Sequence, residues 1–152
     1  MQINKSWRTH IVSLLLALLL TALLGSVLQS LLNLRALTAL AVDIPVSDWL
    51  TTIVYDVLHF APILAALVLA TDLLALPLAA ILQRRWPLPL QGWWWLAGIV
   101  GLALTFRLVD ALAPMPTFIA ATRDTAGWLL MSACGAVGAG VAGCYWQRQQ
   151  ES

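Results

Sequence analysis

The chain has 152 residues, of which only 10% are Asp, Glu, Lys or Arg, whereas about 25% is usual in soluble globular proteins. Hydrophobic residues make up 61% of the chain and the mean hydropathy is +0.88. This composition excludes a soluble globular protein, because such a protein needs many more charged side chains on its surface. The formal net charge of +1 also excludes a strongly basic nucleic-acid-binding protein.

Four apolar runs are each long enough to cross a bilayer, which takes roughly 20 residues of helix. The first run follows a short basic segment with Lys5 and Arg8. Its apolar part is longer than the roughly 7 to 15 residues of a cleavable signal peptide, so we interpret it as a retained helix. The expected spans are residues 11–32, 60–82, 93–112 and 126–146. The sequence therefore predicts an all-α integral membrane protein, a four-helix transmembrane bundle that forms a single domain over residues 1–152.

Aromatic and basic residues near the span ends indicate how the bundle sits in a membrane. Trp93-Trp94-Trp95 opens the third span and Tyr145-Trp146 closes the fourth, which suits the headgroup region. One side is expected to carry Lys5, Arg8, Arg84, Arg85 and Arg148, and the other Arg35 and Arg123 with Asp43, Asp48 and Asp124. By the positive-inside rule we expect both termini in the cytoplasm, the N-in/C-in arrangement, and for a bacterial chain a location in the inner (cytoplasmic) membrane.

The segment before the second span is expected to form an amphipathic helix at the outer surface. Ser47 or Asp48 suits its N-cap, and polar positions recur along one helical face of residues 48–59. Pro62 then removes a backbone donor from the helix and favours a bend. We therefore expect a surface helix over residues 48–59 that leads into a kinked second span.

Polar residues from three spans are expected at a similar depth near the outer membrane boundary. An ionisable side chain costs about 2.5 to 3.5 kcal/mol at the centre of a transmembrane helix, so each such group needs a partner or a wet cavity. The expected buried polar cluster consists of Gln29, Asn33, Asp56, His59, Arg107 and Asp110.

This cluster has three interpretations. In the first it is structural, and Arg107 is neutralised by Asp110 or Asp56. In the second it is a ligand site in which the Arg107 guanidinium binds an anionic group such as a lipid phosphate. In the third His59 is a general base oriented by Asp56, although no Ser or Cys in a recognisable motif accompanies the pair.

Asp72 lies about halfway through the second span, with no evident cationic partner at its depth. One interpretation is a protonated carboxyl group that is hydrogen-bonded within the bundle. The other is a group that carries a proton or a cation. No metal or cofactor is expected, because His10 and His59 are predicted on opposite sides of the bilayer.

The fourth span is rich in small residues, which let helix backbones approach closely. The residues expected to serve helix packing are Ser132, Gly135, Ala136, Ala139, Gly140 and Gly143. They form two ridges, of which one is expected to face the bundle and the other either the bundle or a second chain.

These observations favour a small multi-pass membrane protein that acts as an interaction, accessory or scaffold subunit. It is expected to associate as a homo-oligomer or with a larger membrane complex and to bind a membrane lipid through the polar cluster, but not to bind nucleic acid. The alternative is a small proton-coupled transporter whose coupling site is the intramembrane carboxylate Asp72 or the group Asp56, His59, Arg107 and Asp110. A third hypothesis is a lipid-modifying enzyme at the outer leaflet, which the lack of a recognisable catalytic motif disfavours.

Overall fold

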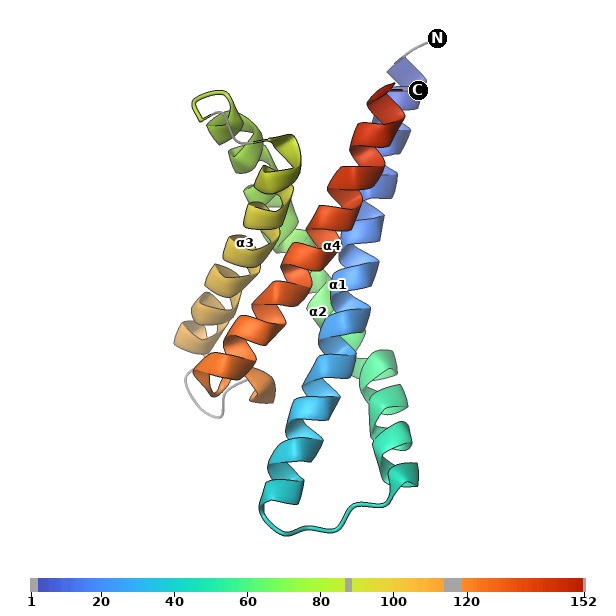
Figure 1. Ribbon diagram of the computed structural model, residues 1–152, viewed down its shortest axis with the longest axis vertical. Coiled ribbons are helices and arrows are strands. Elements are labelled where there is room, and N and C mark those ends of the chain that lie inside the picture. Colours follow the sequence, from blue (N-terminus) through green and yellow to red (C-terminus); the bar gives the residue numbers. More distant parts are fainter. Residues whose placement is uncertain (1–2, 87–88, 114–118, 152) are drawn as a thin grey trace.

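The computed structural model describes the backbone of residues 3–86, 89–113 and 119–151 and the side chains of residues 7–86, 89–113 and 119–150. The elements are α1 (Ile3–Ala39), α2 (Val46–Gln83), α3 (Leu90–Leu112), the short 3-10 helix η1 (Ala120–Thr122) and α4 (Thr125–Glu151) (Figure 1). The four long helices are each long and apolar enough to cross a membrane, and the described residues contain no strand. The predicted all-α architecture with four helices of membrane-spanning length is confirmed.

The four helices run up and down the molecule in sequence order, so that each is antiparallel to the next (Figure 1). α1 and α3 each pack against both α2 and α4, which produces a ring of four helices. The start of α1 and the end of α4 lie at one end of the molecule, together with the end of α2 and the start of α3. We call this the termini end and the opposite one the distal end.

The helices differ in length, and the surplus lies at the distal end. α1 has 37 residues and α2 has 38, whereas α3 has 23. At a rise of about 1.5 Å per residue, α1 and α2 are about 55 Å long and α3 is about 35 Å long, against a hydrocarbon core of roughly 30 Å. The end of α1, the following link and the start of α2 project beyond α3 and α4 (Figure 1). We call residues 35–59 the distal arm.

The expected surface helix and the second span form one continuous helix, α2. Its axis changes direction between the part in the distal arm and the rest (Figure 1), as expected where Pro62 interrupts the backbone hydrogen bonds. The predicted N-cap was wrong. The N-cap is Pro45, because its carbonyl accepts the first helical hydrogen bond from the N–H of Asp48. No side chain caps the helix, and Ser47 Oγ donates to Asp48 Oδ1 instead.

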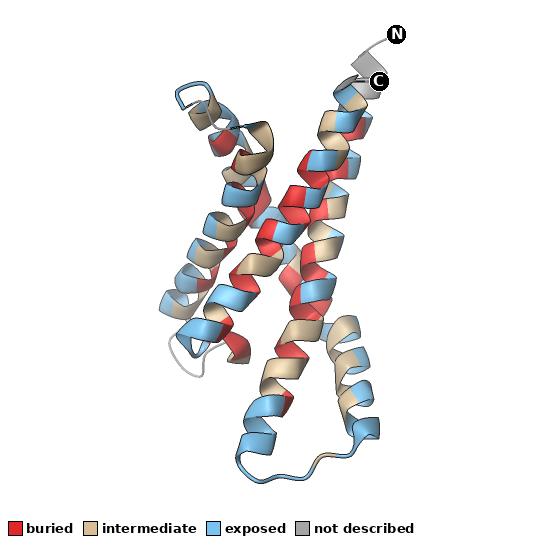
Figure 2. Cartoon of the chain, viewed as in Figure 1, coloured by how far each residue is buried: buried red, intermediate tan, exposed pale blue. Residues whose placement is uncertain are grey.

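The bundle interior is apolar toward the distal end but polar along α1. Leu64, Leu102, Phe106 and Met131 are fully buried and belong to one core cluster. The inward face of α1 instead carries the small polar residues Ser13, Thr21, Ser26 and Ser30, each at most 1% exposed. Its leucines 15, 19 and 23 are exposed, and Figure 2 shows this division of α1 into a buried and an exposed side.

Candidate functional site

Asp56 forms a contact between α1 and α2 near the distal end. Its Oδ2 accepts a hydrogen bond of 2.6 Å from Ser30 Oγ, and Ser30 is fully buried. A carboxylate at the edge of the bundle thus receives a strong donor from the neighbouring helix. Ser30 was not among the predicted site residues, because a single Ser in an apolar span gives no signal of a carboxylate partner.

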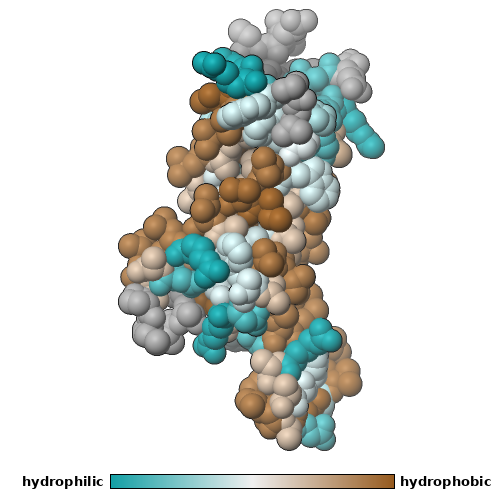
Figure 3. All heavy atoms as spheres, turned by 60° about the vertical axis from the view of Figure 1, so that its left-hand side comes forward, coloured by the Kyte–Doolittle hydropathy of each residue, from teal (hydrophilic) through white to brown (hydrophobic). Residues whose placement is uncertain are grey.

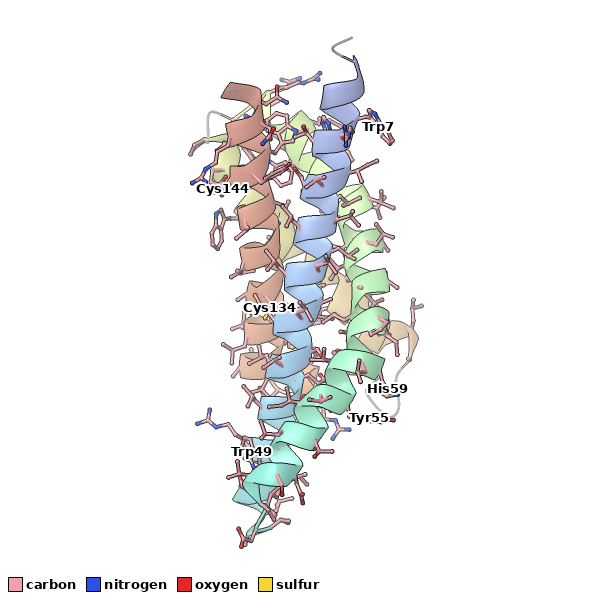
Figure 4. All side chains as sticks on the ribbon, turned by 90° about the vertical axis from the view of Figure 1, so that its right-hand side faces the viewer. Trp7, Trp49, Tyr55, His59, Cys134 and Cys144 are labelled. Atoms are coloured by element: carbon pink, nitrogen blue, oxygen red, sulfur yellow. The ribbon has the colours of Figure 1, made fainter. Side chains whose placement is uncertain are left out.

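His59 does not pair with Asp56. Its Nδ1 lies 2.9 Å from the Tyr55 carbonyl oxygen, and its ring stacks on the Tyr55 ring at a centroid distance of 4.0 Å. Both side chains are exposed on the outer side of α2 (Figure 4). The geometry therefore gives no oriented Asp-His pair of the kind that general-base catalysis uses.

Arg107 and Asp110 have partners on α4 and η1 rather than each other. The exposed Arg107 guanidinium lies 4.4 Å from the centroid of the Trp128 ring, a cation–π contact. Asp110 Oδ2 accepts a long hydrogen bond of 3.4 Å from Thr122 Oγ1, while its Oδ1 is buried without a partner. Among the described residues, no ion pair joins Arg107 to Asp110 or Asp56. The structural interpretation, in which one of these carboxylates neutralises Arg107, therefore does not hold, and the guanidinium contacts the Trp128 ring of α4 instead.

The six predicted cluster residues are thus divided between two interfaces. Gln29 is buried with an unpartnered Oε1, and Asn33 is half-buried beside it along α1. In the described part of the chain, no hydrogen bond joins these amides or Asp56 to the α3 residues Arg107 and Asp110. The reason is the divergence of the distal arm from the end of α3 (Figure 1). Similar depth in the membrane did not imply contact.

The distal arm carries an apolar ridge that no part of the described chain covers. Trp49, Ile53 and Val57 are half-buried in the arm. The outward side, however, is apolar too. The ridge is formed by Val46, Leu50, Val54 and Leu58, which are 77%, 62%, 58% and 65% exposed and follow each other at intervals of four residues. Figure 3 shows apolar side chains on this projecting end of the molecule.

The polar side chains of the arm serve the local backbone or carry negative charge. The Thr51 and Thr52 hydroxyls donate to the carbonyls of Ser47 and Asp48, four residues earlier. The ionisable residues of the arm are Arg35, Asp43, Asp48, Asp56 and His59, so its acidic groups outnumber its permanent cations. With Arg35 as its single Lys or Arg residue, the arm does not have the basic face that is typical of helices lying on anionic membrane surfaces.

Asp72 lies in the middle of α2 and is 4% exposed. Its Oδ2 is buried without a partner, and no hydrogen bond to its side chain occurs among the described residues. The expectation of a lone carboxyl group thus agrees with the geometry, whereas the hydrogen bond of the first interpretation is not present.

The six small residues of α4 predicted to serve packing are all buried within this one chain. A Cβ added at Gly135 would lie 2.6 Å from the carbonyl oxygen of Gly98 on α3, so the two backbones touch there. A Cβ added at Gly138, which the prediction omitted, would lie 2.7 Å from the carbonyl oxygen of Ala17 on α1. Both sides of α4 therefore face the bundle, and these residues form no surface for a second chain.

Comparisons with known proteins add no assignment to this geometry. No family model, curated protein or solved structure that was compared with the chain matches it.

Proposed function

We propose that the protein is an accessory subunit of a membrane complex and that its distal arm binds another integral membrane protein. The observation that carries this proposal is the exposed ridge of Val46, Leu50, Val54 and Leu58 on a part of the chain that projects beyond α3 and α4. A regular row of large apolar side chains is a typical surface for packing against another helix.

Length supports a protein partner rather than lipid chains. α3, at about 35 Å, already spans the roughly 30 Å of hydrocarbon, so lipid chains that surround the bundle do not reach far along the arm. Its acidic character also disfavours the headgroups of an anionic membrane. A partner protein that extends beyond the hydrocarbon core complements the arm, because its apolar side chains can cover the ridge and its surface can be neutral or basic next to the acidic groups.

Site-specific photo-cross-linking in cells tests the proposal. We expect that a photoreactive residue in place of Leu50 gives a discrete adduct with one other protein, which native mass spectrometry then finds at fixed stoichiometry with this chain. Leu69 is the control, because it is 38% exposed on the membrane-spanning part of the same helix. Val46→Asn combined with Val54→Asn should abolish the adduct. Adducts with lipid alone, or with a second copy of this chain alone, would contradict the proposal.

We further propose the N-in/C-in orientation in a bacterial inner membrane, with the arm outside the cytoplasm. The excess of basic residues at the termini end supports it, because Arg84 and Arg85 are exposed there. In a background without Cys134 and Cys144, a membrane-impermeant maleimide should label Asp43→Cys on intact cells. Labelling of Arg85→Cys under the same conditions would contradict the orientation.

A second candidate function is proton-coupled transport, favoured by the buried and unpartnered carboxyl group of Asp72. A flux in proteoliposomes that depends on a proton gradient and is lost in Asp72→Asn, but retained in the exposed variant Asp48→Asn, would support it. If proteoliposomes that contain the unmodified protein show no flux that depends on a proton gradient, this result would contradict the second candidate function.

A further inference from the structure

A cavity of about 420 Å³ lies at the termini end and is bordered by all four helices. α1 and α4 diverge there from α2 and α3 (Figure 1). The residues that the argument uses are His10, Asp72, Pro77, Trp93, Trp94 and Trp146. The volume falls within the range of small-molecule sites, roughly 300 to 1,000 Å³.

Three buried polar groups of the cavity lining have no partner in the described chain: Asp72 Oδ2, Trp93 Nε1 and Trp146 Nε1. Asp72 and Trp93 are only 4% and 5% exposed, so water does not readily serve them from outside. Buried polar groups in folded proteins are almost always hydrogen-bonded, and each exception calls for an explanation. Asp72 supplies the acceptor among these groups, and its carboxyl group, which makes no hydrogen bond within the described chain, indicates a ligand that carries a donor.

Pro77, which also lines the cavity, affects a backbone carbonyl next to Asp72 in sequence. Proline has no N–H, so the carbonyl of Leu73, four residues earlier, loses its usual helical donor. Leu73 and Pro77 both line the cavity. A side-chain carboxyl group and a main-chain carbonyl in need of a donor therefore stand next to each other in sequence on one helix.

Aromatic rings form much of the remaining wall. The Trp94 and Trp146 rings lie 6.3 Å apart between centroids, and the His10 ring meets the Trp146 ring edge-on at 5.9 Å. Aromatic faces attract cations, and aromatic walls beside a carboxylate are a common way of binding organic ammonium groups. Among the described residues, no Lys or Arg lines the cavity.

We propose that this cavity binds a protonated amine with an apolar or aromatic body, whose ammonium group donates to Asp72 and the Leu73 carbonyl while its body packs against Trp93, Trp94 and Trp146. Acceptors for several N–H groups favour an amine over a quaternary ammonium ion, which donates none. The carboxyl group disfavours anions. A metal ion is also disfavoured, because the described residues contain no group of three or more His, Cys, Asp or Glu that would hold one.

One wall of the cavity lies next to the exposed outer surface of α2. Leu73, which lines it, is 59% exposed on the outer side of α2. An amphipathic amine that has partitioned into the leaflet therefore reaches the cavity sideways. This inference concerns binding alone and stands whether the protein is an accessory subunit or a transporter.

Equilibrium binding in lipid nanodiscs, followed by fluorine NMR of the ligand, tests the proposal. The probe is 4-(4-fluorophenyl)butylamine, compared with its trimethylammonium derivative and with the alcohol of the same skeleton. We expect saturable binding of the amine that is at least about tenfold tighter than that of either analogue, since a charge-assisted hydrogen bond contributes on that scale.

Variants localise the binding. Asp72→Asn should weaken amine binding at least about tenfold and leave the alcohol unaffected. Asp48→Asn is the matched control, because it removes the same charge from the exposed distal arm. Ala80→Phe keeps Asp72 but fills space at the cavity wall, so it should abolish binding of all three probes even if Asp72→Asn fails to fold. Equal affinities for amine and alcohol, equal effects of the two Asp variants, or no saturable binding to the unmodified protein would overturn the proposal.

Discussion

The close approach of α3 and α4 at Gly98 and Gly135 makes a quantitative prediction about stability. A Cβ added at Gly135 would lie 2.6 Å from the carbonyl oxygen of Gly98, whereas ordinary van der Waals contacts begin near 3.4 Å, so the helices must separate by about 0.8 Å. The obstacle is backbone and cannot rotate away. Overpacking of this kind costs about 1 to 3 kcal/mol, and the better helix propensity of Ala returns up to about 1 kcal/mol. We expect Gly135→Ala to lower the free energy of unfolding by about 1 to 2 kcal/mol.

Gly92→Ala is the matched control for this substitution. Gly92 lies in the first turn of α3, and the nearest atom to an added Cβ is a Pro89 side-chain carbon at 3.8 Å, an ordinary contact. The same chemical change should therefore stabilise the protein by up to about 1 kcal/mol. Reversible unfolding by dodecyl sulfate in mixed micelles, monitored by circular dichroism, measures both variants.

The reciprocal variant Gly98→Ala sharpens the test. Its Cβ would lie 2.6 Å from the carbonyl carbon of Gly135, so each substitution separates the same two backbones. Once one has opened the gap, the second meets less resistance, and the double variant should lose less stability than the two single losses added together. A Gly135→Ala protein as stable as the unmodified one, or strict additivity in the double variant, would refute the proposed backbone contact.

Three further substitutions probe other contacts in the same unfolding assay. Ser30→Ala removes the donor to the Asp56 carboxylate and should cost about 1.5 to 3 kcal/mol; a neutral effect would show that this hydrogen bond adds nothing. Arg107→Ala should cost only about 0.5 to 1 kcal/mol, because the exposed guanidinium contacts Trp128 and not a buried carboxylate; a loss several times larger would restore the ion-pair interpretation. Ala41 has a positive φ of 60°, so Ala41→Gly should gain about 1 kcal/mol, and a loss would contradict this turn conformation.

The number of long helices and the positions of their apolar parts could be predicted from the sequence because they depend on local patterns, whereas α1 extends beyond the expected residues 11–32 at both ends, to Ile3–Ala39. Four apolar runs separated by polar and proline-containing segments defined four helices. The helical spacing of residues 48–59 predicted a helix before the second span, and the structure shows that this helix continues through Pro62 into the span. An even number of antiparallel helices also brings both termini to one end. These features require no knowledge of which sides of the helices meet.

The rotation of each helix could not be predicted in the same way. In water, apolar periodicity marks the inner face, but in lipid both the solvent and the core accept leucine. In α1 the pattern is reversed, because Ser13 and Thr21 are buried and Leu15 and Leu19 are exposed. Without the rotations, residues at equal depth such as His59 could not be assigned to the correct neighbour.

The tryptophans illustrate the same difficulty. Trp93, Trp94 and Trp146 stand at the ends of spans, where the sequence suggested a position among lipid headgroups. Trp93 is instead 5% exposed, and all three line the cavity that contains Asp72. A Trp at a helix end suits either environment, and only the packing of the glycine-rich α4 against α3 decides between them. Asp72 was found from sequence, but the site around it was not.

The central position of α4 has a consequence for how the protein is made. In an apolar stretch of 18 residues in α4, 61% of the stretch is buried inside the protein, whereas the share in the corresponding stretches of the other three helices is 22% to 33%. This helix follows the other three in the chain, yet it supplies the partner surface for both α1 and α3. Without α4, Thr21 of α1 loses the Cys134 carbonyl to which its hydroxyl donates, and the ring is open. Insertion of α4 is therefore the most interdependent step in assembling the four helices, and a chain that lacks α4 exposes a polar helix face that the bundle hides.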